Sequence, residues 1–143
     1  MAGAGGPKPS ELLTKSALKN ASVVLQATSG STNAIVHLAA IAGRAGITYD
    51  LQELDRVGRD VPVLLDLKPA GNNFMEDFQS GGSLPSLWRR LKDHLDLNAK
   101  TVNGETIGEI IARWPAYVDD KIIRPLDNPL VKSEAIAILT GNL

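Results

Sequence analysis

Residues 61–71 read Val-Pro-Val-Leu-Leu-Asp-Leu-Lys-Pro-Ala-Gly, and this stretch decides the fold class. A short apolar run that is rich in branched side chains and bounded by charge and proline is typical of a buried β-strand. Residues 68–73 then have the composition of a loop. The sequence therefore predicts an α/β segment with one buried strand at residues 61–67.

Helices are predicted on both sides of this strand, because apolar residues recur there at helical spacing. Three helices are expected before it, at about residues 10–27, 31–43 and 50–58. Three more are expected after it, at about residues 75–79, 84–95 and 106–114. The last of these has a reciprocal cap formed by Thr106 and Glu109, and it ends before Pro115. Four charged residues of the helix at 84–95 are expected to face solvent: Arg89, Arg90, Lys92 and Asp93.

The last part of the chain, residues 119–143, changes character. Residues 121–125 and 135–139 are predicted to form short strands, separated by a turn region rich in proline and asparagine. The second strand would be a bare apolar edge, which is a liability in a complete protein, so we expect the natural sequence to continue. Residues 1–9 are expected to be a disordered lead, 10–118 part of an α/β domain, and 119–143 the start of a truncated β-rich domain.

The composition excludes several classes of protein. Fifteen basic and sixteen acidic residues leave no excess charge for a nucleic-acid backbone. Apolar runs of at most five or six residues are too short to cross a membrane, and no signal peptide begins the chain, so a soluble cytoplasmic protein is expected. The absence of cysteine excludes disulfides, thiolate nucleophiles and cysteine-held clusters within this chain.

Two stretches are candidates for binding a small ligand. Gly30–Asn33 lies where a loop enters a helix, so its backbone N–H groups and hydroxyls could bind an anion such as a carboxylate. Ordinary helix capping uses the same residue types, and the residues alone favour capping. Lys68–Gly71 joins the predicted strand to a helix, which is where open α/β sheets usually bind ligands, although such a loop can also be a simple turn.

Other polar residues favour structural roles. Ser31, His37 and Asp66 have the residue types of a hydrolase triad, but the chain lacks the Gly-x-Ser-x-Gly turn that exposes such a nucleophile. His37 has no second histidine at metal-binding spacing. Glu76 and Asp77 are adjacent, so they point to different sides of a helix and are expected to be solvated. No catalytic or metal-binding residue is therefore assigned.

The order of these motifs resembles one known family. Residues 28–34, Thr-Ser-Gly-Ser-Thr-Asn-Ala, together with His37-Leu38, resemble the Gly-Gly-Ser-Thr-Asn-Ala helix start of dihydroxy-acid and sugar-acid dehydratases. Residues 61–71 resemble the segment that carries their Leu-Lys-Pro-Ser-Gly motif. Residues 75–77 and 81–82 resemble the helix that follows that segment, and three further stretches complete the series in the family's order: 102–107, 123–129 and 139–143. In amino-acid sequence, residues 102–107 and 120–130 are more similar to the aldonic-acid enzymes, such as pentonate dehydratases, than to the branched-chain amino-acid enzyme.

The resemblance implies a hydro-lyase that removes water from a 2,3-dihydroxy or sugar acid and yields a 2-keto acid. It also implies an iron–sulfur cluster and magnesium in the full-length parent, which is expected to be a homo-oligomer. The chain would then be a middle segment of the catalytic α/β domain, followed by the first strands of the β-rich domain. The positions that carry over as substrate-binding candidates are Ser31, Thr32, Asn33, Lys68 and Gly71.

The departures from the family pattern limit what this chain can do. The family's cluster cysteines, its carbamylated lysine and most of its metal ligands lie upstream of the matched region, and its base serine lies downstream. Ala70 also replaces the serine of Leu-Lys-Pro-Ser-Gly. We therefore expect a segment that holds no cofactor and is inactive on its own. The alternative is a cofactor-free remnant that binds a small hydroxy acid or a partner protein.

Overall fold

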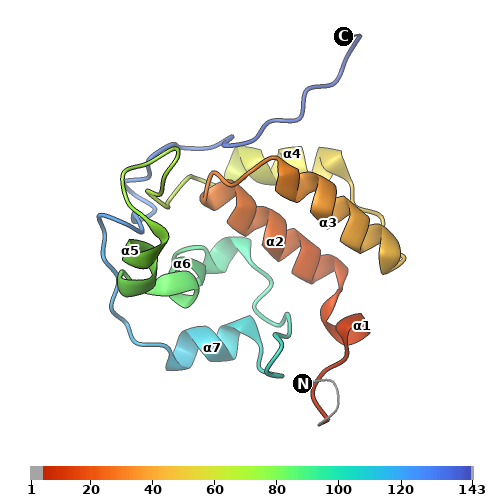
Figure 1. The fold of residues 1–143 in the computed structure, drawn as a ribbon, viewed down its shortest axis with the longest axis horizontal. Helices are drawn as coiled ribbons and strands as arrows, with labels where there is room; N and C mark the ends of the chain where they lie inside the picture. The colour runs from red at the N-terminus through yellow and green to blue at the C-terminus, as the bar shows by residue number, and fades with distance from the viewer. Residues whose placement is uncertain (1–4, 143) are drawn as a thin grey trace.

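A computed structural model describes residues 5–142 of the chain. Within that range the chain forms seven α-helices and one 3-10 helix. In order these are α1 (Pro9–Leu12), α2 (Lys15–Ala27), α3 (Asn33–Arg44), α4 (Leu51–Asp60), α5 (Met75–Ser80), α6 (Ser83–Arg90), η1 (Lys92–His94) and α7 (Ile107–Arg113). Figure 1 shows α2 in the middle, with α3 and α4 along one side and α6 and α7 on the other.

The core forms where the second half of α2, the extended residues 61–65, α6 and residues 122–123 meet. Its most deeply buried side chains include Leu64, Leu87, Leu91 and Ile123, each with no exposed surface. Burying one such side chain stabilises a fold by about 1.5–3 kcal/mol relative to leaving it exposed. These contacts join segments that are far apart in the sequence.

The segment at residues 61–67 is buried as predicted, but the prediction of a strand is wrong within the described residues. Its pairing is limited to three isolated bridges, in which Val63 pairs with Val131, Leu65 with Ile123 and Leu67 with Asn73. Three prolines explain why the bridges do not extend into a ladder, because proline has no N–H to donate: Pro62, Pro125 and Pro129. The chain is therefore mainly helical, and the α/β class rests on the family resemblance.

The strands predicted at residues 121–125 and 135–139 are also absent from the described part of the chain. Residues 122–124 pair with residues 64–66 at a single bridge. In residues 135–139, the side chain of Gln26 makes the hydrogen bonds that a neighbouring strand would make. Its Nε2 donates to the Ile136 carbonyl and its Oε1 accepts from the Ile136 N–H, both at 2.9 Å. The buried Gln26 side chain thus satisfies the backbone groups of Ile136 without a neighbouring strand.

The first predicted helix is divided into α1 and α2. Thr14 adopts an extended conformation between them, and its Oγ1 accepts a hydrogen bond from the Ala17 N–H at 3.1 Å, which caps α2. The helices predicted at 31–43 and 50–58 form as α3 and α4. Asp50 caps α4 by accepting from the Gln52 N–H at 2.9 Å.

The helix predicted at residues 84–95 ends at Arg90, and η1 follows it. The expectation that Arg89 and Arg90 face solvent is wrong, since both are half-buried. Arg89 donates to the carbonyls of Ile111 at 2.9 Å and Trp114 at 2.8 Å, at the C-terminal end of α7, where a positive charge is favourable. Arg90 forms an ion pair with Asp120.

The reciprocal cap of α7 forms as predicted. The Glu109 carboxylate accepts from the Thr106 N–H at 2.7 Å, and the Glu109 N–H donates to Thr106 Oγ1 at 3.2 Å. The hydrogen bond from the Thr106 backbone holds the pKa of Glu109 below its usual range. Among the described residues, no helix combines the length and the apolar character that crossing a membrane would require.

Candidate functional site

The first candidate stretch, Ser31–Asn33, lies exposed at the start of α3. Ser31 Oγ accepts a hydrogen bond from the Asn33 N–H at 3.2 Å, which is the capping role that the residues alone favour. Thr32 occupies the N-cap position, but within the described chain its side chain makes no capping hydrogen bond. The hydroxyl of Thr32 and the amide of Asn33 can therefore contact a ligand without breaking the helix start.

The second candidate stretch, Lys68–Gly71, forms a tight turn. Asp66 organises it, since its Oδ1 accepts from the Asn72 N–H at 2.8 Å, while the Gly71 N–H donates to the Leu67 carbonyl at 2.7 Å. A Cβ atom at Gly71 would overlap the Asp66 carboxylate and lie 2.6 Å from the Leu67 nitrogen, so the turn requires glycine there. The role of Gly71 is therefore to close the turn.

Lys68 is the member of this turn that can meet a ligand through its side chain. The residue is exposed, and its ammonium nitrogen lies 4.0 Å from the centre of the Phe74 ring. A cation over an aromatic face is attracted by the partial negative charge that the ring quadrupole places on that face. Phe74 therefore gives the ammonium group a defined position on the surface.

Both stretches begin from the same junction in the fold. The Ala27 carbonyl at the end of α2 accepts hydrogen bonds from the Leu64 N–H at 2.8 Å and the Leu65 N–H at 3.2 Å. The loop to Ser31 continues from Ala27, and the turn at Lys68 follows three residues after Leu65. The buried contact between Ala27 and the extended segment thus anchors both candidate stretches.

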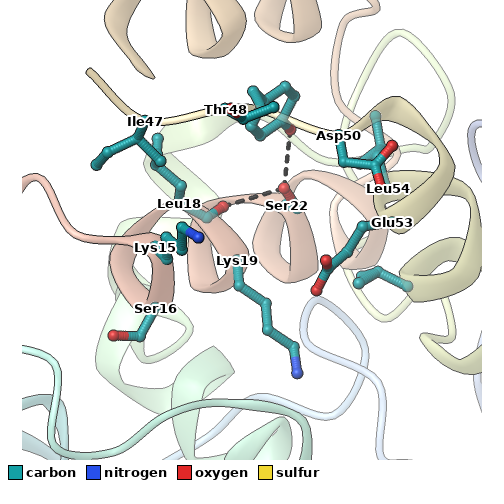
Figure 2. A pocket seen from close by; sticks show the side chains of 12 residues that line it. Lys15, Ser16, Leu18, Lys19, Ser22, Ile47, Thr48, Asp50, Glu53 and Leu54 are labelled. Atoms are coloured by element: carbon teal, nitrogen blue, oxygen red, sulfur yellow. Dashed lines mark hydrogen bonds between the residues drawn. The ribbon is translucent and has the colours of Figure 1, made fainter. Parts of the chain in front are cut away.

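A separate hollow of about 340 Å³ lies between α2, residues 47–49 and α4. Figure 2 shows Lys15 and Lys19 on one side of it and the carboxylates of Asp50 and Glu53 on the other. Sequence reasoning missed this hollow, although the two lysines stand one helical turn apart. None of the five candidate binding residues lines it.

Two of the polar side chains that line this hollow, Ser22 and Tyr49, are hydrogen-bonded to each other. Ser22 Oγ donates to the Leu18 carbonyl at 3.0 Å, and it shares a hydrogen bond of 2.8 Å with the Tyr49 hydroxyl (Figure 2). These bonds tie residues 47–49 to α2. Ser22 and Tyr49 therefore have a structural role, and we assign the hollow no ligand.

The geometry gives no support to a hydrolase triad. Ser31 and His37 are both exposed, on a loop and on α3, while the Asp66 carboxylate is engaged by Asn72 in the turn. Asp77 accepts from the Phe74 N–H at 2.7 Å at the start of α5, whereas the neighbouring Glu76 is exposed. Each of these polar groups thus has a local role or faces solvent.

Comparison with protein families identifies the chain. Residues 1–110 match the family described as "Dihydroxy-acid/6-phosphogluconate dehydratase N-terminal". The chain belongs to this family. The resemblance found in the motifs is thereby confirmed, and the chain is a member of a family of dehydratases, which are lyases.

Curated relatives match almost the whole chain. An L-arabonate dehydratase of Azospirillum brasilense is 44% identical over 137 residues, which are 94% of this chain and 23% of the relative. A mitochondrial dihydroxy-acid dehydratase of Aspergillus fumigatus is 42% identical over 139 residues, 95% of this chain and 23% of the relative. A 6-deoxy-6-sulfo-D-gluconate dehydratase of Pseudomonas putida is 43% identical over 139 residues, 95% of this chain and 24% of the relative. The chain thus spans about a quarter of the length of these relatives.

The relatives include a pentonate dehydratase, as expected from residues 102–107 and 120–130. The dihydroxy-acid and sulfogluconate enzymes match at nearly the same identity, 42% and 43%. Differences this small do not separate the substrates. The dehydratase family is therefore established, and the particular acid is a matter for proposal.

The residues of this chain do not fit the iron–sulfur cluster and magnesium ion that the resemblance implies. Clusters of this kind are held by cysteine thiolates, and the sequence has no cysteine. Among residues 5–142, no three His, Cys, Asp or Glu side chains are grouped so that they could hold a metal ion. Cysteine ligands for such a cluster would have to come from residues outside this chain.

Proposed function

We propose that this chain forms a substrate-side wall of a dehydratase that converts a 2,3-dihydroxy or sugar acid to a 2-keto acid by loss of water. The observation that carries the proposal is the family match over residues 1–110, joined to 44% identity with an L-arabonate dehydratase. Ser31, Thr32, Asn33, Lys68 and Gly71 are the proposed binding positions. Ser31, Thr32, Asn33 and Lys68 are exposed, so a small acid can reach their side chains, which supports this assignment.

The chemical types of these side chains suit a sugar acid. The Lys68 ammonium provides the positive charge that a carboxylate needs, and Phe74 restricts its position. Thr32 and Asn33 offer a hydroxyl and an amide, which can both donate to and accept from substrate hydroxyls. Gly71 contributes by closing the turn that presents Lys68.

Dehydration itself requires groups that this chain does not provide. A proton must leave C2 and a hydroxyl must leave C3 as water, and the resulting enol then becomes the 2-keto acid. Thr32, Asn33 and Lys68 bind and orient the acid for this reaction, while Ser31 and Gly71 form the helix start and the turn that present them. The proposed parent enzyme supplies the acid and base groups, and we propose that the parent is a cytoplasmic homo-oligomer in which residues 10–118 and 119–143 belong to two domains.

A segment exchange tests this function. The matched 137-residue region of the A. brasilense L-arabonate dehydratase is replaced by this chain, and 2-keto acid formation from L-arabonate is measured. We expect turnover, and we expect Lys68→Met to lower kcat/KM at least about tenfold through loss of the carboxylate contact. Lys92→Met, an exposed lysine on η1, is the matched control and should leave kcat/KM unchanged. A folded exchanged enzyme without turnover would refute the proposal.

The exposure of Thr32 and Asn33 in this chain also favours a second candidate, a cofactor-free module that binds a hydroxy acid. Calorimetric titration of the chain with L-arabonate distinguishes the two functions, with L-arabinose as the control that lacks a carboxylate. Binding of L-arabonate by the chain alone, abolished by Lys68→Met, would favour the module. The dehydratase proposal predicts that the chain alone forms no 2-keto acid.

A further inference from the structure

The loop that leads into α7, residues 101–106, carries a reactive pair of residues that has no part in the proposed function (Figure 1). Asn103 is followed by Gly104, and the sequence follows no other asparagine with glycine. Both residues are exposed. The backbone nitrogen after an asparagine can attack the side-chain amide, and glycine has no Cβ atom to shield that nitrogen. This pair is therefore a candidate site for a covalent change.

The turn at this pair leaves the reacting atoms open. Gly104 has a φ of 88°, in the left-handed region that favours glycine. Apart from Gly104 itself and its two neighbours in the chain, no described heavy atom lies within 4 Å of the position that a Cβ atom would take there. Water can therefore reach the bond between Asn103 and Gly104.

Hydrogen bonds nevertheless hold both reacting groups apart. The Gly104 N–H donates to the Thr101 carbonyl at 2.9 Å and closes the turn. The Asn103 amide is held at each end, because the Thr101 hydroxyl is hydrogen-bonded to Oδ1 and Nδ2 donates to the Glu105 carboxylate. Attack on the amide requires the Gly104 nitrogen to approach Asn103 Cγ. These hydrogen bonds must therefore break before the reaction can occur.

Helix α7 fixes the acceptor of this amide. Arg113 donates from Nε and Nη2 to the two carboxylate oxygens of Glu105, at 2.7 Å each. Hydrogen bonding to Arg113, with a smaller part from Asn103, holds the pKa of Glu105 below its usual range. Glu105 is thus a carboxylate near neutral pH, as the Asn103 Nδ2 donor requires. The amide is tied through Glu105 to the helix.

We propose that Asn103 is a site of spontaneous deamidation, which the hydrogen bonds of Thr101 and Glu105 hold back until the loop opens. The Gly104 nitrogen loses its proton and bonds to Asn103 Cγ, while the bond from Cγ to Nδ2 breaks and the amide leaves as ammonia. Water then opens the cyclic imide at either of its carbonyls, which gives aspartate or isoaspartate. The reaction needs water alone as co-reactant, and this inference does not depend on the proposed function.

The product cannot restore the contacts of the loop. A carboxyl group at position 103 is ionised near neutral pH, so it has no N–H to donate to Glu105. It also places a second negative charge beside that carboxylate, and like charges repel. Deamidation would therefore loosen the loop from α7 and keep it loosened.

Mass spectrometry of the digested chain measures the reaction, after incubation at mildly alkaline pH in buffer and in guanidinium chloride. Asn98 is the internal control, because it is also exposed but is followed by Ala99. Thr101→Val removes the hydroxyl that holds the Asn103 amide. Val102→Thr is the matched control variant, since Val102 is 61% exposed in the same loop. Circular dichroism establishes that each variant is folded in buffer.

We expect Asn103 to be modified before Asn98, and at least about tenfold faster in guanidinium chloride than in buffer, because the rate follows the open population of the loop. Thr101→Val should raise the rate in buffer at least about threefold, whereas Val102→Thr should leave it unchanged. If Thr101→Val does not fold, Arg113→Met, which frees Glu105, takes its place with the same expected result.

Three results would overturn the inference. The first is an equal rate at Asn103 in buffer and in guanidinium chloride, because the fold would then give no protection. The second is modification of Asn98 as fast as that of Asn103. The third is an equal rate in buffer for the folded Thr101→Val or Arg113→Met variant and for Val102→Thr, because the loop contacts would then not control the reaction.

Discussion

Helices α2 and α3 are neighbours of similar length, yet their burial is opposite to what their compositions suggest. Helix α2 contains three buried polar residues, Asn20, Ser22 and Gln26. Helix α3 is mostly aliphatic, and within residues 5–142 it buries Ala42 alone. The difference teaches that burial in this chain follows the available partners, since polar side chains can be buried when they are hydrogen-bonded and apolar ones stay exposed when nothing covers them.

The buried polar groups of α2 are paired with distant backbone. Asn20 donates to the Asp96 carbonyl and accepts from the Asp96 N–H, both at 2.9 Å. Gln26 holds Ile136 in the same way. Helix α4 accommodates Gln26 through Gly58, where a Cβ atom would lie 2.6 Å from Gln26 Nε2. These amides make α2 the element that ties the described chain together.

The largest expected effect is the removal of the Gln26 amide. Gln26→Leu keeps a side chain of similar volume but leaves the buried N–H and carbonyl of Ile136 without their partners. We expect the free energy of unfolding to fall by about 3 kcal/mol. Urea denaturation measures it, and Gln52→Leu, at an exposed position of α4, is the control. A loss below about 1 kcal/mol would mean that Gln26 does not hold this segment.

A matched pair of valines tests the comparison of the two helices directly. Val23 of α2 is 1% exposed, whereas Val36 of α3 is 69% exposed. Val23→Ala should cost about 2 kcal/mol because it opens a cavity in the core. Val36→Ala in the free chain should change stability by less than about 0.5 kcal/mol. Equal losses in denaturant unfolding would contradict the description of α3 as uncovered.

The two threonines at the helix starts form a second matched pair. Thr14 caps α2 through its side chain, while Thr32 does not cap α3 within the described residues. Thr14→Ala is expected to lower the free energy of unfolding by about 1 kcal/mol, and Thr32→Ala by less than about 0.5 kcal/mol. Thermal unfolding followed by circular dichroism measures both. A larger loss for Thr32→Ala would assign this hydroxyl to capping and weaken its proposed role in binding.

The smallest expected effect is the weakening, at low pH, of the hydrogen bond between the Ile138 N–H and the Asp55 carboxylate. The hydrogen bond from the Ile138 N–H at 3.0 Å, followed by the Arg59 guanidinium, holds the pKa of Asp55 below its usual range. A carboxyl group with a lower pKa in the folded state stabilises the fold above its unfolded pKa, and this contribution is lost as the pH falls through the folded value. The protection of the Ile138 amide against hydrogen exchange should therefore decrease below about pH 4.

Amide exchange of Ile138, corrected for its intrinsic rate, measures this contact between pH 6 and pH 3 by the ratio of protection factors. Asp55→Asn removes the titrating carboxyl, so its Ile138 protection should change less with pH than that of the natural chain. The same pH dependence in both proteins would contradict the role of Asp55. The Gln26 contact does not titrate, so Ile136 serves as the internal control.

The sequence predicts the elements whose signals are local. The bounds of α3, α5 and α7 follow from nearby caps, breakers and helical spacing, as the reciprocal cap of Thr106 and Glu109 illustrates. At residues 61–67 the sequence pattern correctly indicates burial, but the predicted strand does not form. The antiparallel bridges of Val63 and Leu65 depend on residues about 60 positions away, near several prolines. Local patterns cannot reveal that kind of pairing.

The candidate site was predictable only in part for the same reason. The loop-to-helix position of Ser31–Asn33 and the turn at Lys68–Gly71 are readable from the sequence. The stacking of Lys68 on Phe74 and the close approach of Gly71 to Asp66 depend on the folded turn. The anchoring of both stretches at Ala27 joins segments nearly 40 residues apart, which the residue pattern alone does not indicate.

The most direct test of the central claim is the rate at which the exchanged A. brasilense enzyme converts L-arabonate to its 2-keto acid. The claim that this chain is a substrate-side wall of a dehydratase predicts turnover with the natural chain and a loss of at least about tenfold in kcat/KM with Lys68→Met. A folded exchanged enzyme that forms no 2-keto acid, or one in which Lys68→Met and Lys92→Met behave alike, would contradict it.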